Sequence, residues 1–108
     1  MVYFIKSSCN KFVKIGYSKD PTTRLKELQT ANPYKLSIVF TCEGGYQTEI
    51  GFHELFSQYR TRGEWFSITG KLKVAMKVLN TGFSSAKELE LEICRYQVLA
   101  KIKRKGRL

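Results

Sequence analysis

Cysteine, histidine and acidic residues are all scarce in this chain of 108 residues. Its three cysteines are odd in number, none follows a Cys-x-x-Cys spacing, and only one histidine accompanies them. Such a set favours neither a disulfide framework nor a zinc site. No stretch approaches the roughly 20 apolar residues of a membrane-spanning helix, and the N-terminus offers only the short apolar run VYFI. We therefore expect no membrane partner, no signal peptide and a cytoplasmic location.

The shortage of acids leaves a strong positive charge. The chain holds 9 Asp and Glu against 19 Lys and Arg, a formal net charge of +10 at pH 7. Such an excess favours a polyanionic partner, most often nucleic acid, although an anionic membrane surface also suits the charge. With 43% hydrophobic and 13% aromatic residues, the chain is expected to fold as one domain with a real core.

The apolar pattern predicts a mixed α/β order of elements. A polar link between the first two strands suits a hairpin, and Asp20-Pro21 is a good helix start with Asp as N-cap. Residues 64–68 are too short a run to assign. In chain order the prediction is strands at 2–6 and 12–17, a helix from 21 to about 32, a strand at 35–42, and helices at 46–60, 72–80 and about 86–103.

Two groups of polar residues stand out against this pattern. In FVKIGYSKDPTTR (12–24) the strand carries Lys14, breaks at a glycine, and leads into a helix that bears Arg24. On the 46–60 helix, Glu49, His53 and Arg60 share one narrow stripe. Each group has a plain interpretation, a solvated basic face and a polar helix flank. The functional interpretation of the first group is a site that surrounds a phosphate. That of the second group is a metal site, with Glu49 as a hard oxygen ligand for a Mg²⁺-type ion.

Taken together and in order, these residues resemble the GIY-YIG endonuclease superfamily. Tyr3 lies in VYF where the family has its first motif, and Lys14-Ile15-Gly16 lies where it has its second, followed by Arg24 and Glu49. The stretch EIGFHELFSQYRTRGEWF (49–66) resembles a phage-type branch with a Glu-x-x-x-His helix and a Gly-Glu-Trp-Phe ending. The resemblance covers about residues 2–79.

The resemblance implies a fold and a function. The fold is an α/β (α+β) sandwich, a small three-stranded antiparallel sheet flanked by helices, in residues 1–82. Residues 83–108 add a basic C-terminal helix. The implied function is metal-dependent cleavage of DNA with one Mg²⁺ or Mn²⁺ ion. By motif position, Tyr3 is the general base, Arg24 contacts the scissile phosphate and Glu49 holds the metal. Gly16 allows close backbone approach, and His53 is a candidate catalytic residue on the same helix as Glu49.

The chain departs from the family pattern at two positions. Lys14 replaces the second family tyrosine, and we expect its charge to lower the pKa of the nearby Tyr3 phenol. Tyr17 lies where relatives place a Lys or His, which makes it a candidate support residue. Glu64 lies near an asparagine of many relatives, so it either orients Lys14 or Arg24 or is a plain strand-edge residue. Trp65 and Phe66 are expected in the core rather than as base-stacking platforms.

The C-terminal helix is apolar on two sides, with Leu89, Ile93, Tyr96 and Ala100 on one and Leu91, Cys94, Val98 and Ile102 on the other. It is expected to pack on the domain, with a homodimer as the alternative. The cations of the tail are predicted to bind DNA phosphate in a salt-dependent way, unless the tail is simply solvated. They are Lys101, Lys103, Arg104, Lys105 and Arg107.

Two other functions remain open beside the endonuclease. One is a non-catalytic DNA-binding protein, such as a repressor or a competitor of a related nuclease. The other is a basic module that binds RNA or the ribosome. The complete set of Tyr3, Lys14, Arg24 and Glu49 favours the enzyme, because a protein that only binds DNA has no need of a metal carboxylate in its basic groove.

Overall fold

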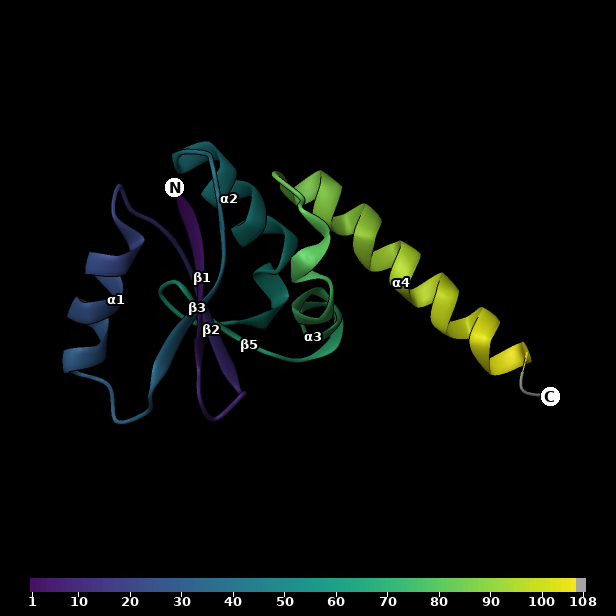
Figure 1. The fold of residues 1–108 in the computed structure, drawn as a ribbon, viewed down its shortest axis with the longest axis horizontal. Helices are drawn as coiled ribbons and strands as arrows, with labels where there is room; N and C mark the ends of the chain where they lie inside the picture. Colours follow the sequence, from purple (N-terminus) through teal and green to yellow (C-terminus); the bar gives the residue numbers. More distant parts are fainter. Residues whose placement is uncertain (107–108) are drawn as a thin grey trace.

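An antiparallel sheet of five strands separates two helical layers in the computed structural model, which describes residues 1–106 (Figure 1). The strands are β1 (Val2–Ser7), β2 (Phe12–Tyr17), β3 (Leu36–Cys42), β4 (Arg60–Arg62) and β5 (Trp65–Ser67), in the spatial order β3-β1-β2-β5-β4. The helices are α1 (Pro21–Thr30), α2 (Tyr46–Leu55), α3 (Gly70–Lys77) and α4 (Ala86–Gly106). Helix α1 lies on one face of the sheet, and α2, α3 and α4 lie on the other. The broad α+β class is therefore confirmed.

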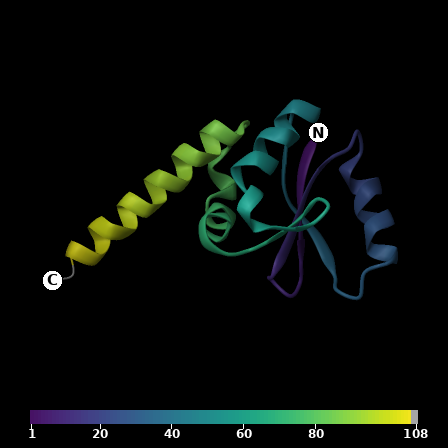
Figure 2. The same ribbon diagram turned by 180° about the vertical axis from the view of Figure 1, so that it is seen from behind.

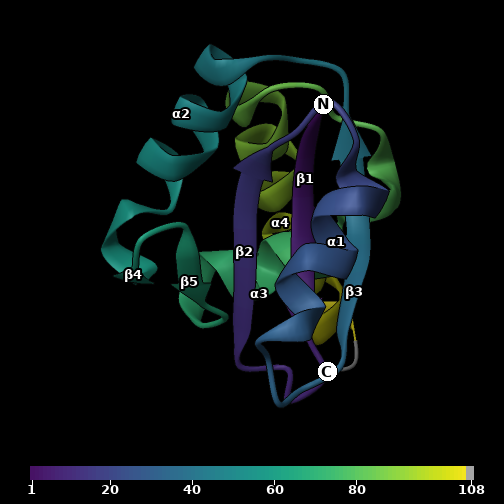
Figure 3. The same ribbon diagram turned by 90° about the vertical axis from the view of Figure 1, so that its left-hand side faces the viewer.

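The first half of the chain folds as its sequence predicts. β1 and β2 form an antiparallel hairpin with Tyr3 opposite Gly16 and Ile5 opposite Lys14. Helix α1 begins where Asp20 caps it, since its carboxylate accepts hydrogen bonds from the backbone N–H and the hydroxyl of Thr23. Figure 3 shows α1 lying across β1 and β3.

The prediction of three strands was wrong, as was the prediction of one helix over 46–60. Helix α2 ends at Leu55, and a 3-10 turn at Ser57–Tyr59 redirects the chain into the hairpin of β4 and β5. Tyr59 lies outside the helix, where its hydroxyl accepts a 2.9 Å hydrogen bond from the Lys71 backbone N–H. Gly63 makes the hairpin turn with φ of +56°, a conformation that favours glycine. The new hairpin pairs with β2 through β5.

Alternation along the strands divides the core between the two faces of the sheet. Val2, Phe4 and Ile15 face α2, α3 and α4 in the larger core, together with Phe66, which is fully buried as predicted. The smaller core lies under α1 and contains Tyr3, Ile5 and Leu36, with the half-buried Trp65 packed against it. The residues of the family-like motifs on β1 and β2 therefore lie on the α1 face.

Only the first half of α4 packs on the domain. Leu89 and Ile93 are buried, whereas Leu91, Val98 and Ile102 are exposed, so the expected packing of the whole helix is not found. The second half projects away from the body of the molecule (Figure 2). Among the tail cations, Lys101, Lys103, Arg104 and Lys105 are exposed on this projecting end, and Arg107 lies outside the described residues. No helix within residues 1–106 combines the length and apolarity that crossing a membrane requires.

Candidate functional site

Tyr3 and Gly16 are paired across β1 and β2, and the tyrosine ring lies over the glycine. A Cβ atom added at Gly16 would lie 2.6 Å from Cζ of Tyr3 and 3.1 Å from Oε1 of Glu64. Glycine is therefore required here by the close approach of the phenol, because any side chain would occupy the space that the ring fills. The same geometry places the Glu64 carboxylate beside the Tyr3 ring.

Glu64 is fixed against β2 by its own backbone and by Lys14. Its carbonyl oxygen accepts a 3.0 Å hydrogen bond from the Ile15 N–H, and its Oε1 lies 3.1 Å from Nζ of Lys14. The Lys14 ammonium also lies 5.7 Å from the centre of the Trp65 ring. Of the two roles that the sequence left open for Glu64, contact with Lys14 is the one the structure shows.

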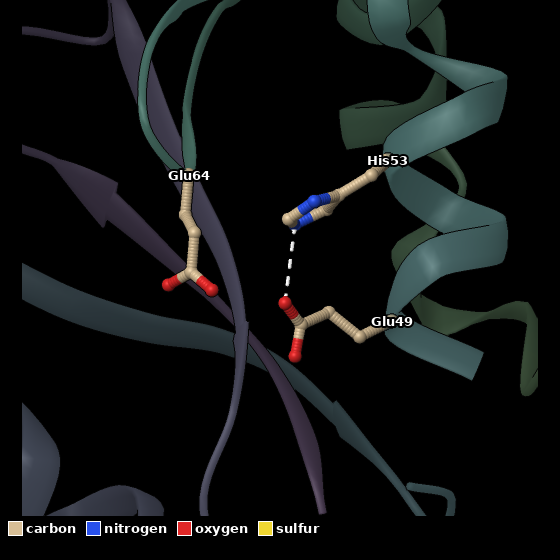
Figure 4. A group of neighbouring side chains, drawn as sticks. All are labelled: Glu49, His53 and Glu64. Atoms are coloured by element: carbon tan, nitrogen blue, oxygen red, sulfur yellow. Dashed lines mark ion pairs between the residues drawn. The ribbon is translucent and has the colours of Figure 1, made fainter. Parts of the chain in front are cut away.

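A second carboxylate approaches from the other side of β2. Glu49 is buried in the first turn of α2, and Figure 4 shows it facing Glu64 while His53 stands one helical turn along. Oxygen atoms of both glutamates and one ring nitrogen of His53 all lie within 4.8 Å of one another. Residues 49, 53 and 64 thus form one group, which we call the carboxylate cluster.

Both ring nitrogens of His53 are already in use. Nε2 lies 2.7 Å from the Ile15 carbonyl oxygen, and Nδ1 lies 2.9 Å from Nη2 of Arg60. A carbonyl can only accept and a guanidinium can only donate, so Nε2 carries the hydrogen and Nδ1 is the acceptor. His53 is therefore the neutral Nε2–H tautomer, and its role in the cluster is to fix α2 against β2. Its Nε2 lies 3.6 Å from Oε1 of Glu49.

Arg60 reaches His53 by a route that the sequence pattern did not predict. The residue was expected on the same helical stripe as Glu49 and His53, but it is the first residue of β4. Arg60 still contacts His53, because the 3-10 turn after α2 reverses the chain and brings the Arg60 guanidinium to Nδ1 of the imidazole.

The two glutamates have pKa values shifted in opposite directions. Burial, the hydrogen bond with Glu64 and the charge of Glu64 raise the pKa of Glu49 from 4.5 to about 7, against the opposing charge of Lys14. Burial alone would raise the pKa of Glu64, but hydrogen bonds with Glu49 and Lys14 hold it below its ordinary value. Glu49 is therefore the carboxylate of the pair that holds a proton more readily, and a cation could take the place of that proton.

The expected depression of the Tyr3 pKa is not found. Burial and the charge of Glu64 raise the pKa of Tyr3 to about 12, and the nearby charge of Arg24 offsets only part of this. The prediction failed because the charge of Lys14 is already paired with Glu64 at 3.1 Å. Lys14 thus acts on the carboxylate rather than on the phenol.

The remaining predicted residues lie at different distances from the cluster. Arg24 is exposed on α1, pairs with Glu27 at 3.5 Å, and lies close enough to Tyr3 to lower its pKa. Tyr17 lies opposite Val2 in the sheet, on the side away from Tyr3, and it is 39% exposed. The alternation of β2 therefore separates Tyr17 from Lys14 and Gly16.

Comparison with known proteins gives one match. The model of the T5orf172 domain family matches residues 1–82. No curated protein matches the chain, and no solved structure does. The matched range contains the carboxylate cluster together with Tyr3, Lys14 and Arg24, and it ends before α4.

We predict that Gly16→Ala destabilises the protein through Tyr3. The new methyl group cannot share space with the ring, so the free energy of unfolding should fall by about 1–3 kcal/mol. The loss should be much smaller in a Tyr3→Val background, where the ring is absent. Urea denaturation of the four proteins in this double-mutant cycle measures the coupling, and equal losses in both backgrounds would contradict the contact.

We also predict that stability falls as pH rises from about 4.5 to 7, because Glu49 binds its proton more tightly when folded than when unfolded. Thermal unfolding should show a higher midpoint near pH 5 than near pH 8. Glu49→Gln should remove most of this difference, whereas Glu54→Gln, an exposed position on the same helix, should leave it unchanged. An undiminished pH dependence in Glu49→Gln would assign the effect to other groups.

Proposed function

The chain belongs to the T5orf172 domain family, a phage-associated domain related to nuclease-like folds, and from this we propose that it is a metal-dependent DNA endonuclease of the GIY-YIG type. The observation that carries the proposal is the carboxylate cluster, in which Glu49 and Glu64 face each other across β2 in a strongly basic chain. Two carboxylates held this close need a proton or a cation between them.

The donors of the cluster fit Mg²⁺ or Mn²⁺. Both glutamates offer hard oxygen atoms, and these ions bind through few carboxylates and retain several waters. His53 is not counted as a ligand because both of its nitrogens are engaged. When bound at Glu49 and Glu64, the ion would polarise the phosphoryl oxygen and offset the carboxylate charges that raise the Tyr3 pKa.

The residues around the cluster then take distinct roles. Tyr3, once ionised to the tyrosinate, accepts the proton of the water that attacks phosphorus, and Arg24, whose charge favours the tyrosinate, neutralises the phosphate oxygens. The bond from phosphorus to the 3′ oxygen breaks, and that oxygen leaves with a proton from solvent. Lys14 is a positioning residue that holds Glu64, and His53 is one that holds α2 against Ile15.

One observation favours the alternative of a DNA-binding protein without catalysis. Burial raises the pKa of Tyr3 to about 12, so its tyrosinate forms less readily than that of an ordinary tyrosine. A chain that never bound a metal ion would keep the neutral phenol and retain only the basic surface. The two functions therefore differ in whether the glutamates bind a divalent ion.

A plasmid assay separates the two functions. We expect supercoiled DNA to be cut in Mg²⁺ or Mn²⁺ and not in EDTA. Glu49→Gln should abolish cutting while DNA binding persists, and Glu54→Gln serves as its control. Tyr3→Phe should slow cutting roughly a hundred- to ten-thousand-fold, whereas Tyr17→Phe should not.

Metal binding can be measured separately from cleavage, because bound Mn²⁺ should raise the unfolding temperature of the protein. The proposal fails if Glu49→Gln cuts normally in the same buffer. It also fails if the unmodified chain binds DNA but neither cuts it nor is stabilised by Mn²⁺, which is the behaviour of the non-catalytic protein.

A further inference from the structure

A hollow lies on the α1 face of the sheet, toward the end of β2 that carries Phe12. It has a volume of about 270 Å³, and its lining includes Phe12, Tyr34 and Trp65 together with Arg62 and Asn32. Phe12 and Tyr34 are 38% and 52% exposed, which is high for aromatic rings in a small domain. The combination of aromatic faces and one guanidinium is typical of sites that bind unpaired nucleobases.

The hollow meets the candidate site through the contact between Trp65 and Lys14. Trp65 lines the hollow, and the Lys14 ammonium lies 5.7 Å from the centre of its ring. Phe12, Lys14 and Gly16 alternate along β2 on this same face, so Phe12 and Gly16 lie about 13 Å apart along the strand. A short run of nucleotides can cover this distance, with its phosphates near Lys14.

The backbone of Tyr34, whose side chain lines the hollow, is held by two hydrogen bonds. The Tyr34 N–H donates a 3.0 Å hydrogen bond to Oδ1 of Asn32, and the Tyr34 carbonyl accepts one of 2.9 Å from the Gln29 amide. The ring is thus presented from a braced segment that follows α1. A fixed backbone reduces the conformational freedom that is lost when a base stacks on the ring.

We propose that this hollow binds an unpaired nucleobase of the DNA strand that passes the carboxylate cluster. The inference rests on the proposed function and deepens it. It assigns to the enzyme a substrate with unpaired nucleotides a short run away from the cleaved bond, rather than continuous duplex. The base stacks on Tyr34 and Trp65, and Arg62 neutralises an adjacent phosphate.

Trp65 is the only tryptophan of the chain, so its fluorescence reports directly on the hollow. We expect a short oligothymidine to quench it in EDTA, and a blunt duplex of matched length to quench it far less. Tyr34→Ala should weaken oligothymidine binding roughly 10- to 100-fold. The control Tyr46→Ala, which removes a 69% exposed ring on α2, should not.

Equal quenching by the duplex, or unchanged affinity in Tyr34→Ala, would overturn the proposal. Because the titration contains no metal, its outcome is independent of cleavage. Quenching that persists in Glu49→Gln, or in a chain that never cuts DNA, supports the hollow even where the endonuclease itself fails.

A separate observation concerns the projecting helix α4. Leu91, Val98 and Ile102 are 63%, 55% and 58% exposed and share one side of the helix, opposite the buried Leu89 and Ile93. We call Leu91, Val98 and Ile102 the outer seam. An apolar stripe on a projecting helix is stabilised when a second helix packs against it and removes it from water.

The distribution of charge along α4 favours a second copy of the same helix as the partner. Residues 88–92 contain three glutamates and no cation, whereas residues 101–105 contain four cations and no acid. An antiparallel pair with Leu91 opposite Ile102 of a second copy brings each acidic segment alongside a basic one. A parallel pair would instead align like charges. The geometry points to a homodimer formed by two antiparallel α4 helices.

Sedimentation equilibrium of the full chain tests this pairing. We expect the unmodified chain to have the mass of a dimer and Val98→Lys to have the mass of a monomer. Gln97→Lys adds the same charge on another side of the helix and should remain a dimer. A monomeric unmodified chain, or a dimer that survives Val98→Lys, would overturn it. The four cations of residues 101–105, which would pair with glutamates in the dimer, were also predicted from the sequence to bind phosphate. Dimer formation and DNA binding would therefore compete for the same side chains.

Discussion

The pairing of the β4–β5 hairpin with β2 is the constraint on which the rest of the site depends. It brings the Glu64 backbone to Ile15 and the Glu64 carboxylate to Lys14. Without it, Glu49 would lie alone in the first turn of α2 and its pKa would lose the contribution of a second carboxylate. The Trp65 ring would also lose its place against the smaller core. A hairpin of two three-residue strands thus assembles a site from parts of the chain that are far apart in sequence.

The fold was predictable where local rules decide it. Period-two alternation places Tyr3, Lys14 and Gly16 on one face, and the Asp20 cap fixes the start of α1 and so the position of Arg24. The end of α2 was not predictable, because a tertiary hydrogen bond to Tyr59 overrides helical periodicity there. β4 could not be found either, since its three residues are all exposed and show no apolar alternation.

The candidate site was predictable in its members but not in their interactions. Glu49 and Glu64 are separated by fourteen intervening residues, and no spacing rule indicates that their carboxylates meet. The rise in the Tyr3 pKa depends on burial and on which cations are already paired, and neither can be read from residue order. His53 shows the same limit, because its tautomer follows from the Ile15 carbonyl and Arg60 together.

The outer edge of the sheet has a consequence for the behaviour of the protein in concentrated solution. β4 is an edge strand of three exposed residues, two of them arginine. Strand edges are where folded domains recruit foreign strands and begin to aggregate, and short charged edges resist this. Arg60 and Arg62 give this edge two positive charges, which disfavour the addition of a further strand from another basic chain.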